Sequence, residues 1–199
     1  MSQDSRDLIA AHLARSQAAF ERLAKDAALL AAARQAAVNI IAALRAGNKL
    51  LIVGNGGSAA DAQHIAAEIV GRYKQDRQAH AAIALTTDTS ALTAISNDYG
   101  FEQVFARQVA GLGRRGDALL ALSTSGRSPN ILAALATARE LGLVTIAFTG
   151  SQGAPMLGAL CDHLLIAPSD DTAIIQQLHL AVAHGICDEI EWALRDGEK

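Results

Sequence analysis

The stretch Lys49–Ser58, which reads Lys-Leu-Leu-Ile-Val-Gly-Asn-Gly-Gly-Ser, decides the fold class of this chain. Its first half is a short, uninterrupted apolar run, as expected for a strand of a parallel sheet that helices cover on both faces. The glycine-rich turn opens directly into a helical stretch, and its glycines allow a backbone that exposes consecutive amides. Because amides at the start of a helix bind anions, this turn is a candidate anion site.

The rest of the chain repeats this alternation of an apolar run and a helical stretch. We expect strands at residues 49–53, 81–86, 118–123, 144–149 and 163–167, and helices at 58–73, 88–97, 102–111, 128–141, 153–160 and 172–195. This pattern predicts an α/β fold, a doubly wound five-stranded parallel sheet flanked by helices. Ligands of such sheets bind at the carboxyl ends of the strands, where the unusual loops of this chain stand.

Residues 7–46 precede the first strand and form an Ala/Leu-rich helical stretch with an expected break near Lys25-Asp26. We therefore divide the chain into an N-terminal helical arm, residues 1–46, and a ligand-binding domain, residues 47–199. An amphipathic arm of this kind packs in an oligomer interface or folds back on its own sheet, and the sequence leaves both alternatives open.

The composition excludes several classes of protein. The 199 residues are 51% hydrophobic and 19% charged, so a folded core is expected. The formal net charge of −3 and the aromatic content of 4% argue against a nucleic-acid partner. Cys161 and Cys187 predict buried thiols rather than a disulfide scaffold. The polar N-terminus, and apolar stretches interrupted by residues such as Arg34 and Asn39, predict a cytoplasmic protein with no membrane partner.

A second candidate anion site follows the third predicted strand, where residues 123–130 read Ser-Thr-Ser-Gly-Arg-Ser-Pro-Asn. A helix N-cap followed by Pro129 needs only one serine, so the additional hydroxyls favour phosphate binding. Arg127 either adds a positive charge or is only solvated. Two such loops on neighbouring strands predict a phosphorylated small molecule as the ligand.

The first turn also matches the Gly-x-Gly-x-x-Ala fingerprint of dinucleotide-binding proteins through Ala59. That fingerprint needs an acidic residue at the end of the second strand. Asp76 precedes the strand and Asp88 lies too far beyond it, so a nicotinamide-dependent oxidoreductase is disfavoured.

His64 and Glu68 stand four residues apart in the helix after the first loop, and therefore on one helix face. Such a pair can hold Zn²⁺ or act as an acid and a base. On the last helix, eight residues separate Gln176 from His184, which corresponds to about 800° of rotation and a rise of about 12 Å. His179 is the nearer partner of Gln176, and the spacing alone leaves both histidines open as its companion.

The two loops together resemble the sugar isomerase (SIS) domain family, and within it the phosphoheptose isomerases, over residues 35–195. The resemblance is carried by both glycine- and serine-rich loops and by four segments: 54–68 with Ala-Asp-Ala-Gln-His, 86–90, 97–101 and 176–184. It implies the SIS fold, a homotetramer, one Zn²⁺ per subunit, and conversion of sedoheptulose 7-phosphate to D-glycero-D-manno-heptose 7-phosphate through an enediol. That reaction supplies precursors of ADP-heptose and of the lipopolysaccharide core.

The resemblance also implies roles for individual residues. Glu68 is the expected base and His184 the expected acid. The expected metal ligands are His64, Glu68, Gln176 and His184. Substrate contacts are expected from Asn55, Gly56, Gly57, Ser58, Glu68, Asn97, Asp98, Ser123, Thr124, Ser125, Ser128 and Gln176, of which the serines and Thr124 form the phosphate cradle. Asp98 can instead serve a simple turn.

The chain departs from the family pattern before the last helix's histidine, where a basic residue, Ile, Gln and Glu are usual. Here Ile174 replaces the basic residue and Gln177 replaces the Glu. This affects substrate affinity or subunit contacts but leaves the four expected ligands present. The competing hypothesis is a non-catalytic SIS protein that binds a replication initiator, a class similar to this chain in Thr87-Asp88 and Leu92–Ile95 that has no need of Glu68 and His184.

Overall fold

The computed structural model describes residues 7–195, and its core is one sheet of five parallel strands. The strands are β1 (Leu50–Gly54), β2 (Ala82–Ala84), β3 (Ala118–Leu122), β4 (Val144–Gly150) and β5 (His163–Ala167). Every residue of β1 and β3 is buried, which explains why these sequences are apolar without alternation. The predicted fold class is confirmed.

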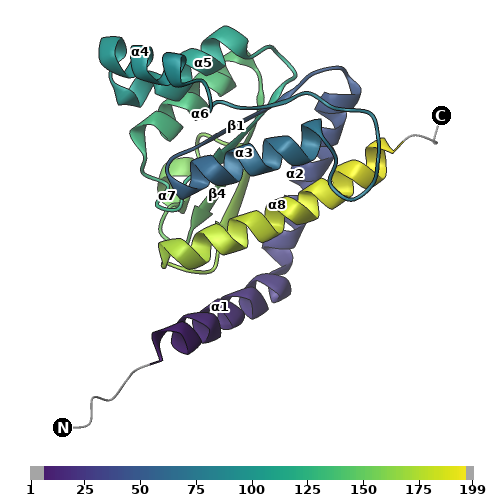
Figure 1. Ribbon diagram of the computed structural model, residues 1–199, viewed down its shortest axis with the longest axis vertical. Coiled ribbons are helices and arrows are strands. Elements are labelled where there is room, and N and C mark those ends of the chain that lie inside the picture. Colours follow the sequence, from purple (N-terminus) through teal and green to yellow (C-terminus); the bar gives the residue numbers. More distant parts are fainter. Residues whose placement is uncertain (1–6, 196–199) are drawn as a thin grey trace.

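Helices cover both faces of the sheet (Figure 1). One face carries α2 (Ala27–Arg45), α3 (Gly57–Val70) and α8 (Thr172–Leu194), and the other carries α5 (Val104–Leu112) and α6 (Pro129–Leu141). Successive residues of β1 point to opposite faces, so Leu50 and Ile52 pack in the first core while Leu51 and Val53 pack in the second. Two apolar layers therefore hold the sheet in place.

The strand order β2-β1-β3-β4-β5 places the first and third strands side by side. After β1 the chain forms β2 at one edge of the sheet. It then crosses to the other side of β1, where β3, β4 and β5 follow in order. Gly54, the last residue of β1, pairs with Leu122, the last residue of β3. The loops after β1 and β3 therefore meet at the switch point of the sheet, where open α/β folds bind their ligands.

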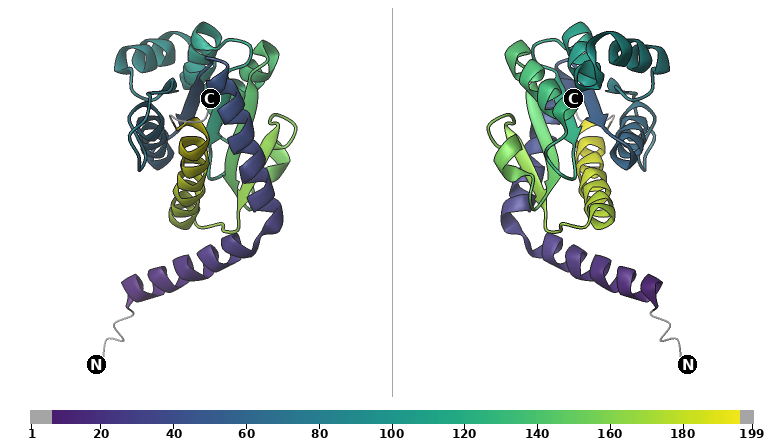
Figure 2. Two further views of the ribbon diagram at one scale, coloured as in Figure 1. Left: turned by 90° about the vertical axis from the view of Figure 1, so that its right-hand side faces the viewer. Right: turned by 90° about the vertical axis from the view of Figure 1, so that its left-hand side faces the viewer.

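The N-terminal stretch consists of two helices, α1 (Leu8–Lys25) and α2. Asp26 separates them, and its carboxylate caps α2 by accepting a hydrogen bond of 3.0 Å from the amide of Leu29. α2 folds back on the sheet and contributes Ile40 to the first core. α1 projects from the body of the fold (Figure 2), and Leu8 and Ile9 at its start are 72% and 76% exposed. The division of the chain at residue 46 stays a prediction.

In residues 7–195, α2 is the one helix that is long and apolar enough to cross a membrane by length and composition. A core helix of a soluble protein passes the same test, and α2 packs on the sheet and against α8 (Figure 1). We therefore interpret α2 as a core helix.

Several predicted elements differ in extent from the observed ones. α3 ends at Val70 because Gly71 takes a non-helical conformation. The predicted helix 102–111 is divided into a 3₁₀ turn η1 (Phe101–Gln103) and α5, and the helix predicted at 153–160 is only the single turn α7 (Ala154–Leu157) between two glycines. β2 lies at one edge of the sheet and has three residues, fewer than the predicted 81–86.

Both cysteines are free and buried, as predicted. Burial raises the pKa of Cys161 to about 11 and that of Cys187 to about 12, so both remain neutral thiols at neutral pH.

Candidate active site

The loop after β1 enters α3 through a conformation that requires glycine. Gly56 has a φ of +57°, which side chains rarely adopt. A Cβ atom on Gly57 would lie 2.5 Å from Nε2 of Gln176, so the Gln176 side chain of α8 covers this loop. Ser58 is buried in the first turn of α3. The structure thus brings the loop of the first expected anion site together with Gln176, which lies far away in the sequence.

Two asparagines join the loops at the switch point of the sheet. Nδ2 of Asn55 donates to Oδ1 of Asn130, and Nδ2 of Asn130 donates to Oδ1 of Asn55, each at 2.9 Å. Asn130 is buried in the first turn of α6. The sequence predicts nothing for Asn130 beyond its place at the end of the serine-rich loop, because a lone asparagine carries no signal for an amide pair between two loops.

The loop after β3 forms a compact turn in which the Ser123 and Ser128 hydroxyls lie close to each other. Oγ of Ser123 accepts a hydrogen bond of 3.1 Å from the amide of Gly126 and lies 3.4 Å from Oγ of Ser128. Gly126, with a φ of +64°, packs directly on Gly153. Ser123 and Ser128 thereby fix the shape of the loop.

Thr124 and Ser125 line a cavity of about 120 Å³ beside this loop. The hydroxyl residues Ser151, Ser169 and Thr172 line the same cavity, together with Arg127, Asp170 and other residues. The cavity lies at the carboxyl ends of β3, β4 and β5. A pocket with this many hydroxyl groups can donate several hydrogen bonds to one phosphate.

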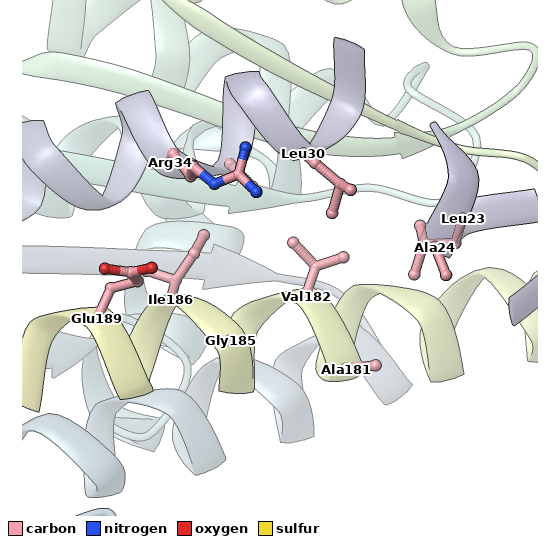
Figure 3. A pocket seen from close by; sticks show the side chains of 10 residues that line it. Leu23, Ala24, Leu30, Arg34, Ala181, Val182, Gly185, Ile186 and Glu189 are labelled. Atoms are coloured by element: carbon pink, nitrogen blue, oxygen red, sulfur yellow. The ribbon is translucent and has the colours of Figure 1, made fainter. Parts of the chain in front are cut away.

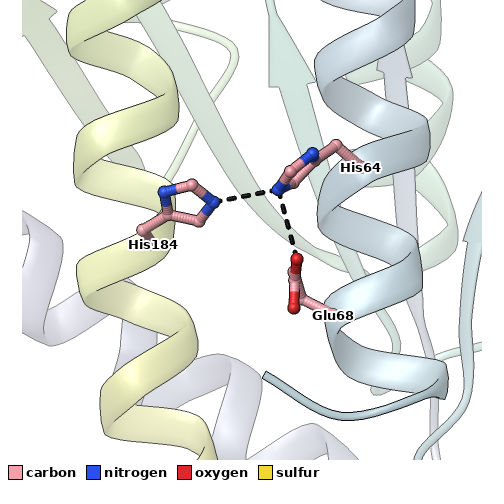
Figure 4. Close-up of side chains that lie close together, drawn as sticks. All are labelled: His64, Glu68 and His184. Atoms are coloured by element: carbon pink, nitrogen blue, oxygen red, sulfur yellow. Dashed lines mark hydrogen bonds and ion pairs between the residues drawn. The ribbon is translucent and has the colours of Figure 1, made fainter. Parts of the chain in front are cut away.

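Three titratable side chains converge where α3 and α8 lie side by side (Figure 4). Nε2 of His64 lies 2.9 Å from Nε2 of His184 and 3.2 Å from Oε1 of Glu68. His64 is exposed, whereas Glu68 and His184 are half-buried. The i,i+4 spacing on α3 therefore places His64 and Glu68 together as predicted, and α8 supplies His184.

The donor atoms of this cluster fit a cation. One atom each from His64, Glu68 and His184 lie within 4.8 Å of one another. Nε2 of His64 carries at most one hydrogen and cannot donate it well to both His184 and Glu68. A cation bound between the three side chains would satisfy all of their donor atoms. Ligands of a tetrahedral zinc ion lie about 3.4 Å apart, given bonds of about 2.0–2.2 Å, and imidazole with carboxylate is a usual zinc donor set.

The other histidine of α8 lies outside the cluster. His179 is 3% exposed and its ring meets Phe148 edge-on at 5.6 Å. Burial lowers the pKa of His179 to about 4, against a small opposing effect from the backbone of Thr149. The geometry therefore pairs His64 and Glu68 with His184 rather than His179, and the choice of His184 as the companion of Gln176 stays a prediction.

Asn97 and Asp98 lie on α4 (Thr89–Tyr99), which has no buried residue. Nδ2 of Asn97 donates to Oδ1 of Asp98 at 2.8 Å, and both side chains are exposed. α4 stands with α5 at the end of the molecule away from α8 (Figure 1). Within this subunit the structure does not bring these two residues to the cluster, and their role as substrate contacts stays a prediction.

Two residues beside the cluster carried no signal of their own in the sequence. Asp61 is one turn before His64 on α3, and burial raises its pKa while His64 opposes that shift. The ring of Tyr73 stacks on that of His184 with centroids 5.5 Å apart. Asp61 stands inside the segment that carries the family resemblance, which was the only available hint of its importance.

Comparison with known proteins gives the family. Residues 12–150 match the model of the SIS domain. A phosphoheptose isomerase of Bradyrhizobium sp. strain BTAi1 is 72% identical over 194 residues, which cover 98% of each chain. The chain belongs to the phosphoheptose isomerase family. The family resemblance drawn from the two loops is thereby confirmed.

Solved structures of phosphoheptose isomerases share the whole fold. The protein from Neisseria gonorrhoeae is 46% identical and aligns with a TM-score of 0.87 over 94% of this chain and 98% of its own. The protein from Francisella tularensis is 39% identical, with a TM-score of 0.90 over 96% of this chain and 100% of its own.

The two departures from the phosphoheptose isomerase pattern both face α1. Ile174 is buried in an apolar cluster with Ala19 and Leu23 of α1. Nε2 of Gln177 lies 3.1 Å from Nε2 of His12 on α1. In this chain the positions therefore serve the contact between α8 and α1.

Proposed function

We propose that this chain is an aldose–ketose isomerase that converts sedoheptulose 7-phosphate to D-glycero-D-manno-heptose 7-phosphate. The observation that carries the proposal is the convergence of Glu68 and His184 in a fold that also carries two loops suited to phosphate. The curated relative at 72% identity, which bears the name phosphoheptose isomerase, supports the same activity.

Glu68 acts as the base and His184 as the acid. The Glu68 carboxylate removes a proton from C1 of the ketose while His184 donates a proton to the oxygen on C2, which gives an enediol. Return of a proton to C2 and loss of the proton on the C1 oxygen then give the aldose. A base and an acid held within a few ångströms of each other suit such a transfer between adjacent carbons.

One Zn²⁺ per subunit is the proposed cofactor, and His64, Glu68 and His184 would hold it. Gln176 is the fourth proposed ligand, on the family resemblance alone; in this subunit its side chain lies over the loop at Gly57. When bound, the ion supplies a positive charge that stabilises the oxyanion of the enediol. The donor set of the three converging residues supports zinc over magnesium, which prefers oxygen ligands alone.

The phosphate and the sugar have separate proposed contacts. The phosphate cradle consists of Ser58, Ser123, Thr124, Ser125 and Ser128. The sugar contacts are Asn55, Gly56, Gly57, Asn97, Asp98 and Gln176. The hydroxyl-lined cavity supports Thr124 and Ser125 of the first set, and the position of Gln176 over Gly57 supports these two residues of the second.

The working form is proposed to be a homotetramer in the cytoplasm, where its product enters ADP-heptose and lipopolysaccharide core synthesis. An apolar groove of about 370 Å³ lies between the α1–α2 corner and α8, with Leu23, Leu30 and Val182 in its wall (Figure 3). At the other end of α1, away from this groove, Leu8, Ile9 and Leu13 are exposed. Burial of these surfaces against another copy supports assembly, and a stable, active monomer in sedimentation would contradict it.

The activity is tested by incubating the protein with sedoheptulose 7-phosphate in D₂O, with and without a chelator, and following the products by NMR. We expect aldose formation with deuterium at C2, because the enediol exchanges protons with solvent. Glu68→Gln should lower turnover at least about 10³-fold while the substrate still binds.

Full activity in Glu68→Gln would remove that residue from its role. Absence of turnover and of zinc binding in the wild type, together with tight binding to a replication initiator, would instead favour the non-catalytic alternative.

A further inference from the structure

The segment between α3 and β2, residues 71–81, has no regular structure, yet one buried carboxylate fixes it. Glu191 of α8 is 4% exposed. It accepts hydrogen bonds of 2.9 Å from the amides of Tyr73, Lys74 and Gln75. Burial alone would raise the pKa of Glu191, but these three amides and Arg77 outweigh it and lower the pKa.

Arg77 links the same carboxylate to the end of α3. Its Nε lies 3.7 Å from Oε2 of Glu191, and its side chain is 1% exposed. Its guanidinium donates to the carbonyls of Glu68 at 2.7 Å and of Ile69 at 3.0 Å. A buried pair with this many hydrogen bonds fixes the segment relative to both helices.

The fixed segment places Tyr73 against His184. The two rings lie 26° from parallel with centroids 5.5 Å apart. His184, Asp188 and Glu191 stand at i, i+4 and i+7 on α8, so one face of the helix carries both the imidazole and the carboxylate that positions the tyrosine. Lys74 pairs with Asp188 at 2.7 Å at the exposed edge of this contact.

Among the described residues, the ring of His184 has two ring neighbours, His64 and Tyr73, and its one hydrogen bond is to His64. Rotation of an imidazole about its last side-chain torsion has broad minima, so a single contact leaves its orientation loosely defined. The stacked phenol ring restricts that rotation and keeps Nε2 of His184 aimed at the cluster.

We propose that Tyr73 is a positioning residue for His184, held in place by the Glu191–Arg77 pair. The part of this inference that concerns catalysis rests on the proposed function, whereas the part that concerns the cluster's affinity for a cation does not. Second-layer contacts to metal ligands commonly change metal affinity or activity about 10–100-fold.

The test compares Tyr73→Leu with Tyr73→Phe in the full chain. Zn²⁺ affinity of the metal-free protein is measured by competition with a chromogenic chelator, and kcat and KM are measured with sedoheptulose 7-phosphate. We expect Tyr73→Leu to weaken zinc affinity and lower kcat about tenfold, with KM within twofold of the wild type. Tyr73→Phe keeps the ring and should match the wild type in all three.

Asp188→Asn is the matched control. It removes the exposed ion pair between Asp188 of α8 and Lys74 but leaves the stacked rings, so zinc affinity, kcat and KM should all remain unchanged. Melting temperatures of all variants identify any that fail to fold, and if Tyr73→Leu does, Tyr73→Ile, which likewise removes the ring, replaces it with the same expected losses.

Wild-type zinc affinity and kcat in Tyr73→Leu would overturn the inference, as would an equal loss in Tyr73→Phe, which would assign the effect to the hydroxyl. A wild type that binds zinc tightly but does not isomerise the heptose phosphate would refute the proposed function alone. Absence of both zinc binding and turnover in the wild type would overturn both.

Discussion

Helix α8 carries two histidines five residues apart in two very different environments. His179 lies against Phe148 in the core, where burial lowers its pKa to about 4. His184 lies half-buried at the surface between α8 and α3, with Nε2 at 2.9 Å from that of His64.

The difference between these regions shows how the fold gives two histidines of one helix different chemical surroundings. Apolar groups of the core surround the ring of His179. A positive charge on that ring would be costly, and among the described residues no second ligand atom stands beside it to help bind a metal ion. The surface brings the other ring to an imidazole and a carboxylate on a neighbouring helix. The packing of α8, rather than the residue type, therefore assigns the two roles.

The largest expected effect separates the two histidines by activity. His184→Gln should lower kcat about 10³-fold, because it removes the proposed acid and a proposed metal ligand. His179→Leu should retain kcat within a few-fold at pH 7, since its ring lies outside the cluster. Steady-state kinetics of both variants test this, and equal losses would erase the distinction between the two environments.

A second prediction uses the acid sensitivity of the buried ring. The pKa of His179 is about 4 in the fold against about 6.5 when unfolded, so only the unfolded chain gains this proton as the pH falls below 6.5. The fold should lose about 3 kcal/mol between pH 6.5 and 4 through this group. Urea unfolding of wild type and His179→Leu across that range measures it, and parallel pH curves would contradict the prediction.

A third prediction concerns the cation that would join α3 and α8. Zinc at about 100 times its dissociation constant stabilises a fold by about 2.7 kcal/mol, which corresponds to roughly 5–10 °C in melting temperature for a chain of this size. Wild type and His179→Leu should show this rise after zinc is added to chelator-treated protein. His184→Gln should show no such rise. The full rise in melting temperature in that variant would show that zinc binds at a different site.

The smallest expected effect belongs to the proposed phosphate loop, for which we propose a role in binding and none in proton transfer. Ser125→Ala should raise KM about tenfold, the loss expected for one hydrogen bond to a charged group, with kcat nearly unchanged. Ser151→Ala, which removes another hydroxyl that lines the same cavity, is the variant with which its KM and kcat are compared. A fall in kcat without a change in KM for Ser125→Ala would show that the loop acts in the chemical step rather than in binding.

Sequence reasoning succeeded where one local pattern has one structural outcome. The apolar run at Leu50–Val53 is a strand, the turn at Gly56 has the positive φ that only glycine adopts readily, and His64 with Glu68 share a helix face. It was less accurate at 153–160, where the structure has only the single turn Ala154–Leu157.

Long-range contacts account for what sequence reasoning missed. The amide pair of Asn55 and Asn130 joins residues 75 positions apart, and Glu191 fixes amides more than 115 positions away. No local periodicity in the sequence encodes these hydrogen-bond partners, because the contacts depend on how α6 and α8 pack on the sheet.

The sequence by itself determined the strands, the glycine and serine loops and the chemical nature of the cluster, since backbone preference and side-chain chemistry act over a few residues. Only the tertiary structure decided that β1 and β3 are neighbours, that α2 covers the sheet, and that His184 rather than His179 meets His64. Those outcomes follow from burying the apolar faces of all helices at once, which is a property of the whole chain.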